Sequence, residues 1–282
     1  MHPHALTTLA RHATHANQGT PTLISQLELI AIKPPVTLNM LSYSIFVSFI
    51  LSGEQTMTLG EQTFALKSGD VCFVPFEMPM IGRFMADNRP QFLAVSLLLD
   101  EQWLGEIIQE VQIGTHTAPQ SGVVLGQMDG NIENCLERLI GLLDAPPQFA
   151  YLSELYKKEL IVHLLNTPLK GSLLAFANQN SQLQKIKKVS DYLKQHWADK
   201  VSVAQLAILA QMGESSFYHY FKAITGFTPL QYQKAIRLNH AKKMIENKVF
   251  SISQIAYEVG YESVSQFSRE YKRMFGVSPR MG

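Results

Sequence analysis

The sequence predicts an α+β protein of two domains, an N-terminal β-barrel with accompanying helices and a C-terminal all-α domain. Apolar and polar residues alternate between residues 23 and 99, and after Asp100 apolar residues recur with the period of a helix. Near the C-terminus one phrase occurs twice, which indicates a duplicated helical unit. A length of 282 residues suits two domains. We expect them to span residues 1–170 and 182–282, with the junction near residues 169–180.

Composition indicates a soluble globular protein, because 46% of the residues are hydrophobic and 17% are charged. The longest apolar run, residues 40–51, is too short to cross a bilayer, and the N-terminus lacks the pattern of a signal peptide. Only Cys72 and Cys135 are present, so a disulfide framework is not expected. Cys135 is interpreted as a core thiol, with a sensor thiol as the alternative. We expect a cytoplasmic protein with no membrane partner.

Charge is distributed unevenly along the chain. Residues 182–282 hold 15 Lys and Arg against 7 Asp and Glu, whereas residues 1–181 hold 9 against 16. A basic segment joined to an acidic one points to a polyanion as the partner of the basic part. A solvated helical surface is the alternative.

Short β-prone runs separated by turn residues fill residues 23–99 and predict a small barrel. The stretch from Gly53 to Pro75 resembles the strand sequence of cupins. Metal-binding cupins carry His-x-His and a Glu in this motif, whereas no His lies between His15 and His116 here. We therefore expect a cupin-like barrel without a metal centre. The N-terminal histidines are interpreted as part of a loosely held segment rather than as metal ligands; they are His2, His4, His12 and His15.

Aromatic residues of the predicted strands are candidates to line an effector cavity inside the barrel, and a filled core is the alternative. They are Tyr43, Phe46, Phe64, Phe73, Phe76 and Phe92.

Amphipathic helices are predicted after Asp100. In one of them, Ile132, Leu136, Leu139, Ile140 and Leu143 share a single face. The helices within residues 131–166 are the candidates for a homodimer interface.

The repeated phrase reads SSFYHYFKAITGFTP from Ser215 and SQFSREYKRMFGVSP from Ser265. Upstream, VSVAQLA at residues 201–207 is answered by FSISQIA at residues 250–256. The second copy contains one extra residue in its turn, because the offset grows by one between the two pairs. Each copy is typical of a short helix, a tight turn and a longer helix, which is a helix-turn-helix unit.

Capping residues define the helices of the first unit. Ser202 is expected to cap a helix over 203–210, and Gly213 to take a positive φ in the turn. The second helix is expected over 215–225 and to end at Gly226. In the second unit the corresponding signals are Ser251 or Ser253, Gly260, Ser263 and Gly276.

Apolar spacing predicts which faces are buried, and a base-stacking platform is the less favoured interpretation of the aromatic residues. The core of the first unit is predicted as Leu206, Ala207, Ala210, Phe217, Phe221 and Ile224. That of the second is predicted as Ile255, Ala256, Val259, Phe267, Tyr271 and Phe275.

The outward faces of the two longer helices are the predicted DNA contacts, because a helix fits the major groove and reads base edges with polar side chains. On the first helix these are Ser215, Ser216, Tyr218, His219 and Lys222, and on the second Ser265, Gln266, Ser268, Arg269, Lys272 and Arg273. Arg269 and Gln266 suit bidentate base contacts, whereas Lys272 and Arg273 suit phosphates. A solvated helix surface is the alternative for each.

A single amphipathic helix is predicted between the units, beginning at Pro229. Its apolar residues are expected to pack on both units; they are Leu230, Ile236, Leu238, Ala241 and Ile245. A helix of about 18 residues is about 27 Å long, so it would hold the units nearly one duplex turn apart, about 34 Å.

The two helix-turn-helix units and the helix between them resemble the AraC/XylS family of bacterial transcription regulators. The resemblance covers residues 183–280 through GESSFYHYFKAITGFTPLQYQKAIRL and GYESVSQFSREYKRMFGVSP, and more loosely the upstream part through LERLIGLLDAP and YKKELIVHLL. It implies promoter DNA as the partner, base contacts from both recognition helices, and an N-terminal domain that binds a small effector, dimerises, or both. The first recognition helix lacks the Arg found in many members.

The function expected from the sequence is therefore a DNA-binding transcription regulator that recruits RNA polymerase at promoters and is controlled through its N-terminal domain. A cupin-type enzyme and a protein-interaction module are the alternatives. No catalytic motif, metal-ligand set or phosphate-binding loop is present, so neither an enzymatic activity nor a cofactor is expected.

Overall fold

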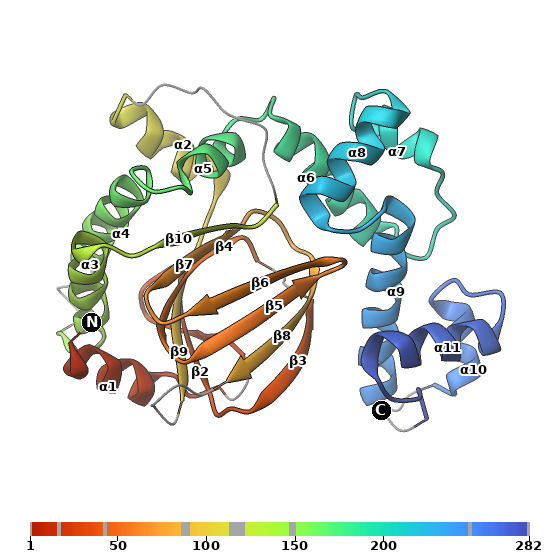
Figure 1. The fold of residues 1–282 in the computed structure, drawn as a ribbon, viewed down its shortest axis with the longest axis horizontal. Coiled ribbons are helices and arrows are strands. Elements are labelled where there is room, and N and C mark those ends of the chain that lie inside the picture. Colours follow the sequence, from red (N-terminus) through yellow and green to blue (C-terminus); the bar gives the residue numbers. More distant parts are fainter. Residues whose placement is uncertain are drawn as a thin grey trace.

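The computed structural model describes residues 2–15, 18–41, 44–85, 91–112, 122–146, 151–247 and 250–280. An N-terminal part of strands and flanking helices lies beside a C-terminal part made of helices alone (Figure 1). The α+β class and the two-part organisation predicted from the sequence are confirmed. None of the described helices is both long and apolar enough to cross a membrane.

The strands form two antiparallel sheets. The six-stranded sheet has the order β1-β2-β9-β4-β7-β10, and the four-stranded sheet has the order β3-β8-β5-β6. A closed barrel is not confirmed, because the pairing of the described strands never joins one sheet to the other. The strands are β1 Thr20–Pro21, β2 Leu27–Ile32, β3 Val36–Leu41, β4 Phe46–Ser52, β5 Glu54–Leu59, β6 Gln62–Lys67, β7 Asp70–Val74, β8 Pro79–Met85, β9 Phe92–Leu98 and β10 Val124–Gln127.

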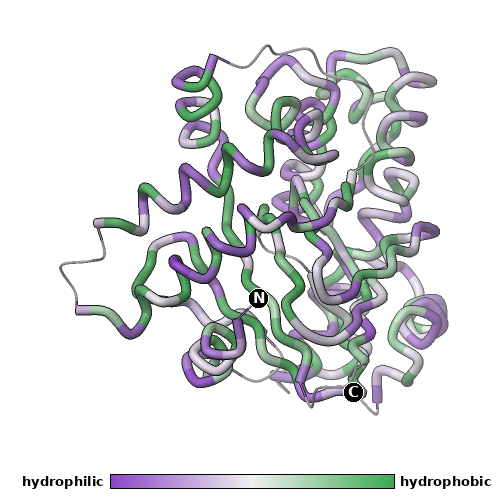
Figure 2. Tube along the Cα trace, turned by 60° about the vertical axis from the view of Figure 1, so that its left-hand side comes forward, coloured by the Kyte–Doolittle hydropathy of each residue, from purple (hydrophilic) through white to green (hydrophobic). Residues whose placement is uncertain are grey.

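Burial along each strand follows its place in a sheet. β4 and β9 lie inside the six-stranded sheet and are buried almost throughout, whereas the edge strand β6 alternates between exposed and more buried positions. Figure 2 shows hydrophobic stretches along the strands and alternating hydrophilic and hydrophobic positions along the helices. The apolar interior of the N-terminal part therefore lies between the two sheets and under the helices.

Among the described residues, five α-helices accompany the sheets, namely α1 Pro3–His12, α2 Glu101–Glu110, α3 Gly130–Gly141, α4 Tyr151–Leu164 and α5 Lys170–Ala177. The predicted face of α3 is buried at Ile132, Leu136, Leu139 and Ile140, whereas Leu143 lies beyond the helix and is only partly buried. Cys135 is also buried, and its thiol donates to the Tyr156 carbonyl at 3.1 Å. Burial raises the pKa of this thiol to about 12, so the reduced thiol stays protonated at neutral pH.

The described segments of the C-terminal part hold six helices: α6 Gln182–Gln195, α7 Val203–Leu209, α8 Glu214–Thr225, α9 Pro229–Glu246, α10 Ile252–Glu258 and α11 Val264–Phe275. α7 with α8, and α10 with α11, form the two helix-turn-helix units, and α9 runs between them (Figure 1). All residues predicted for the two cores are buried except Phe275, which is partly buried.

The predicted caps form as expected. Ser202 and Ser251 begin α7 and α10 with reciprocal capping boxes, and Ser263 caps α11. α8 and α11 end at Gly226 and Gly276 in the left-handed conformation.

Two local predictions are wrong. Gly213 does not take a positive φ: it is the N-cap of α8 with φ −67°, and Gln211 carries the positive φ of 54°. Leu230 does not pack on the units, because its side chain is 46% exposed. Two positions later Tyr232 is fully buried and supplies that contact from the first turn of α9.

Candidate nucleic-acid interface

The N-terminal half of α8 is open to solvent. Ser215, Ser216, Tyr218 and His219 are exposed, while Phe217 between them is fully buried. Recognition helices of helix-turn-helix proteins contact base edges with their N-terminal residues. The exposed residues of α8 therefore occupy the positions that such contacts require.

α11 presents a corresponding surface with more positive charge. Ser265, Gln266, Arg269, Lys272 and Arg273 are exposed, and Ser268 is half-buried. Three of them, Gln266, Arg269 and Arg273, recur at spacings of three and four residues and thus lie along one side of the helix.

Glu270 lies among these residues and was not singled out in the sequence. Its carboxylate accepts hydrogen bonds from Lys234 at 3.0 Å, Tyr261 at 2.8 Å and Gln266 at 3.2 Å. Burial tends to raise the pKa of Glu270, but these donors outweigh it and leave the pKa below its ordinary value. The carboxylate therefore stays ionised, and it orients the Gln266 amide on the helix surface.

The C-terminal half of α8 contacts the β5–β6 hairpin of the N-terminal part. Lys222 Nζ lies 3.0 Å from Glu61 Oε2, and Gln62 Nε2 donates to the Ala223 carbonyl at 3.1 Å. The backbone N–H of Glu61 also donates to the Gly226 carbonyl at 3.3 Å. Lys222 is thus a predicted DNA contact that the N-terminal part already engages.

Close backbone approach makes this contact possible. Gly60 at the hairpin turn has φ +56°, and a Cβ there would lie 2.1 Å from the Gly226 carbonyl oxygen. Any side chain at residue 60 would therefore push the hairpin away from the end of α8.

A second contact joins the two parts deeper in the structure. The buried Tyr232 hydroxyl donates to the Glu77 carbonyl at 2.6 Å and lies 2.5 Å from Ser190 Oγ. The Glu77 carboxylate pairs with Lys194 at 2.8 Å. Glu77 lies between β7 and β8, and it therefore links the N-terminal part to both α6 and α9.

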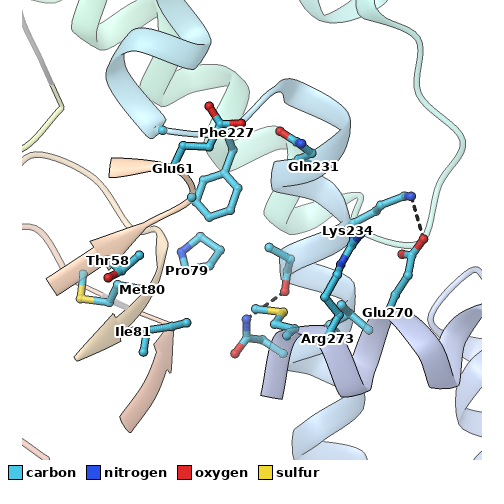
Figure 3. A pocket seen from close by; sticks show the side chains of 16 residues that line it. Thr58, Glu61, Pro79, Met80, Ile81, Phe227, Gln231, Lys234, Glu270 and Arg273 are labelled. Carbon is cyan, nitrogen blue, oxygen red and sulfur yellow. Dashed lines mark hydrogen bonds and ion pairs between the residues drawn. The ribbon is translucent and has the colours of Figure 1, made fainter. Parts of the chain in front are cut away.

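A groove of about 330 Å³ lies between the hairpin, β8, α9 and α11 (Figure 3). Pro79, Met80, Ile81 and Phe227 supply apolar walls. Lys234, Glu270 and Arg273 lie on the opposite side, where the Lys234–Glu270 pair bridges α9 and α11. One edge of α11 consequently faces the N-terminal part.

A second cavity of about 480 Å³ lies between the two sheets, with α9 at one end. Phe46 and Phe92, two of the predicted effector-pocket residues, line it together with Phe84 and Met57. Its lining residues from α9 are Asn239, Lys242, Lys243 and Glu246.

The other predicted pocket residues lie elsewhere. Phe73 and Phe76 are fully buried outside the lining, and Phe73 packs edge-on against Phe176 of α5. Phe64 is partly buried on the edge strand β6 and does not line the cavity. Tyr43 falls outside the described residues. Within the described ranges, no group of three or more His, Cys, Asp and Glu side chains is arranged to hold a metal ion.

Family models match both parts of the chain. The model of the AraC-type transcriptional regulator N-terminus matches residues 23–172, more than half of the chain. The chain belongs to the family of AraC-type transcriptional regulators. A helix-turn-helix domain model matches residues 206–281, which include α8, α9, α10 and α11. This AraC-type protein is thus a DNA-binding transcription regulator.

Similar AraC-type sequences are also transcription regulators. The probable transcriptional regulator LumQ of Photobacterium leiognathi is 35% identical over 119 residues, which cover 42% of this chain and 48% of LumQ. The match thus spans about half of that relative. The transcriptional regulator ExsA of Pseudomonas aeruginosa is 24% identical over 238 residues, covering 83% of this chain and 84% of ExsA.

Solved structures share the fold of this AraC-type chain. ToxT of Vibrio cholerae with a bound unsaturated fatty acid has a TM-score of 0.58 at 15% identity, covering 90% of this chain and 92% of ToxT. ToxT bound to (E)-4-(8-methylnaphthalen-1-yl)but-3-enoic acid also has a TM-score of 0.58 at 15% identity, covering 91% and 97%. At this identity the likeness concerns the fold alone.

Proposed function

We propose that α8 and α11 enter successive major grooves on one side of promoter DNA. The exposed N-terminal residues of both helices carry this proposal, because they stand where recognition helices read bases. Arg269 and Gln266 read base edges on α11, while Tyr218 and His219 contact bases on α8. Lys272, Arg273 and, once free of Glu61, Lys222 contact phosphates. The serines of both helices provide shorter polar contacts.

The cavity between the sheets is the proposed effector site. Its interior is apolar at Phe46, Phe84 and Phe92, and Lys242 and Lys243 bring positive charge to the wall formed by α9. Such a site suits a carboxylate with an apolar body, because the head group can pair with lysine while the body displaces water from apolar walls. Both ToxT ligands named above are carboxylic acids, which agrees with this ligand class.

Effector binding is proposed to act through the contact between the two parts. The effector cavity and the groove of Figure 3 share Met80 and Asn239 as lining residues, so a ligand in one contacts a wall of the other. Movement of α9 would loosen or tighten the hairpin contact that holds Lys222. A ligand can shift this equilibrium only by its difference in affinity for the two arrangements.

Homodimerisation is proposed through α3 and α4. Tyr151 and Leu155 on α4 are 77% and 51% exposed, which is unusual for large apolar side chains one helical turn apart. Analytical ultracentrifugation of the wild type and of Leu155→Asp tests this: a dimer that dissociates in the variant supports it, and a monomeric wild type contradicts it. Recruitment of RNA polymerase by the DNA-bound regulator, and hence activation, completes the proposal.

DNA binding is tested by selecting duplexes from a random library with the full-length chain. The affinity for the selected duplex is then measured between 50 and 200 mM salt, where counterion release predicts a steep loss of affinity. A flat response, or no enriched sequence, would contradict the proposal.

The effector site is tested with oleate: saturable binding that weakens in Lys242→Gln and Lys243→Gln, but not in Lys200→Gln, supports it.

A further inference from the structure

The two helix-turn-helix units meet at the guanidinium of Arg237, a half-buried residue near the middle of α9. Its Nε donates to the Trp197 carbonyl at 2.7 Å, and its Nη2 donates to the carbonyls of Ala198 at 3.1 Å and Asp199 at 3.0 Å. Its Nη1 donates to the Gly260 carbonyl at 3.1 Å. Four of the five donors of this side chain are therefore used on backbone oxygens.

These acceptors belong to different units. Residues 197–199 lead from α6 into α7 of the first unit, whereas Gly260 is the turn between α10 and α11 of the second. We propose that Arg237 is the positioning residue that fixes the spacing and orientation of the two recognition helices. The effect of this spacing on DNA binding rests on the proposed function. If both helices bind DNA, their fixed spacing determines the separation of the two DNA subsites that the protein accepts.

The surroundings of Arg237 leave little freedom at this joint. Gly260 has φ +80°, and a Cβ there would lie 3.0 Å from both the Ala198 carbonyl oxygen and Arg237 Cζ. Trp197 stacks on His240 of α9 with ring centroids 4.6 Å apart and packs against the apolar clusters of both units. The turn of the second unit thus lies directly on the loop of the first.

Neighbouring side chains make other contacts at this joint, including the Lys234–Glu270 pair between α9 and α11. Gln233 Nε2 donates to the Trp197 and Asp199 carbonyls at 3.3 and 2.8 Å, but it does not reach the second unit. Lys200 and Glu262 also link the two loops at 2.7 Å, but their side chains are 90% and 81% exposed, so solvent screens the pair. The planar fork of Arg237 is the buried, directional element of the joint.

The bridge acts together with the Lys234–Glu270 pair and the apolar contacts of α9 to hold the second unit against the first. Burial lowers the pKa of Arg237 from its ordinary value, which records the cost of holding the guanidinium away from water. Without it, the Gly260 carbonyl loses its donor from α9, while Gln233 still satisfies part of the first loop. The loss therefore removes a side chain that donates to both units, and we expect it to change their relative orientation.

The first experiment measures the selectivity for subsite spacing. The full-length wild-type protein first selects a duplex from a random library. A second duplex carries one extra base pair between the two grooves that the recognition helices contact, and the ratio of the affinities for the two duplexes is measured. The insertion rotates one subsite by about 34–36° relative to the other. We expect the wild type to lose at least about tenfold in affinity and Arg237→Gln to lose less than about threefold. Lys200→Gln, the matched control at the same joint, should keep the wild-type ratio.

A ratio that is unchanged in Arg237→Gln would overturn the inference, even if overall affinity fell, because a merely structural role weakens both duplexes alike. Arg237→Lys should also relax the ratio, since an ammonium group cannot reproduce the fork.

The second experiment needs no DNA and decides the inference even if the wild type selects no sequence. Spin labels are attached to the cysteines introduced by Ser216→Cys and Ser268→Cys in the full-length chain. The native cysteines are both buried, so the labels react with the introduced thiols. Double electron–electron resonance should give a narrow distance distribution that broadens in Arg237→Gln and not in Lys200→Gln. Equally narrow distributions in all three proteins would overturn the proposal. Failure of DNA selection alone would count against the proposed function.

Discussion

Glu61 at the turn of the β5–β6 hairpin lies 3.0 Å from Lys222 on α8, although 161 residues separate them. Lys222 lies in the last turn of the recognition helix α8, and its side chain is proposed to contact a DNA phosphate. The hydrogen bond and charge of Glu61 raise the pKa of Lys222, so the lysine is fully charged in this contact. Under the proposed mode of DNA binding, the N-terminal part would therefore compete with a phosphate for this ammonium group.

Glu61→Gln should strengthen DNA binding by the full-length protein, because it removes the competing carboxylate from Lys222. The expected gain is about two- to fivefold at low salt and smaller at high salt, since the pair is solvent-accessible. Fluorescence anisotropy with the selected duplex measures the effect. Glu54→Gln, an exposed carboxylate on the same hairpin, is the control and should leave the affinity unchanged. An equal gain in both variants would indicate a general charge effect and contradict the specific contact.

Arg269→Ala should relax discrimination at one base pair by about 1–3 kcal/mol, because a bidentate contact with a guanine edge is lost. Lys272→Ala should instead weaken all duplexes by a similar factor and lower the salt slope by about one. Affinities for the selected duplex and its single-base-pair variants separate the two effects. If Arg269→Ala weakens every duplex equally, Arg269 contacts phosphate and not a base.

Gly260→Ala should destabilise the protein more than Gly276→Ala. Both glycines have a φ close to +80°, so both variants place an L-residue in the left-handed region at a cost of about 1–2 kcal/mol. The Cβ at residue 260 also meets the Ala198 carbonyl and the Arg237 guanidinium, whereas no atom of the described residues lies within 4 Å of a Cβ at residue 276. Chemical denaturation gives the two free energies of unfolding. Equal losses would mean that the joint adapts to the added methyl group.

Stability should fall as the pH is lowered through the titration range of His240. Burial, and then the nearby charge of Lys243, lower the pKa of His240 in the folded protein. The unfolded chain then binds more protons between the folded pKa and the unfolded value of about 6.5, so the free energy of unfolding decreases as pH falls through that window. Thermal unfolding from pH 8 to pH 5 should show this decrease in the wild type.

His240→Gln should flatten that pH dependence, although it also loses the ring stacked on Trp197. His219→Gln, which changes an exposed histidine on α8, serves as the control and should keep the wild-type slope. An identical slope in His240→Gln and the wild type would exclude His240 as the titrating group.

The helical half of the fold was predictable because its signals are local. Ser202, Ser251 and Ser263 cap helices whose apolar residues recur at helical spacing, and Gly226 and Gly276 end them. The repeat strengthened the prediction, since each signal appears twice. The positive φ of Gln211 was not predicted, because Gly213 two residues later is the residue type that favours this conformation. No local sequence signal shows which of the two residues adopts the positive φ.

Long-range pairing explains what the sequence did not predict. Strand-forming patterns indicate strands but not whether two sheets close into a barrel, which depends on pairing between distant segments. The engagement of Lys222 by Glu61, and of four carbonyls by Arg237, likewise joins residues with no local signature. Leu230 and Tyr232 show a further limit, because both are apolar near the start of α9 and only the packed structure decides which is buried.

The two recognition helices are proposed to bind adjacent major grooves on one side of a duplex. Methylation-interference footprinting of the full-length protein on its selected duplex tests this most directly. We predict two patches of major-groove contacts about 10–10.5 base pairs apart on the same side of the DNA. Arg269→Ala should remove contacts from one patch only. A single patch, or interference confined to methylated minor-groove adenines, would contradict this mode of binding.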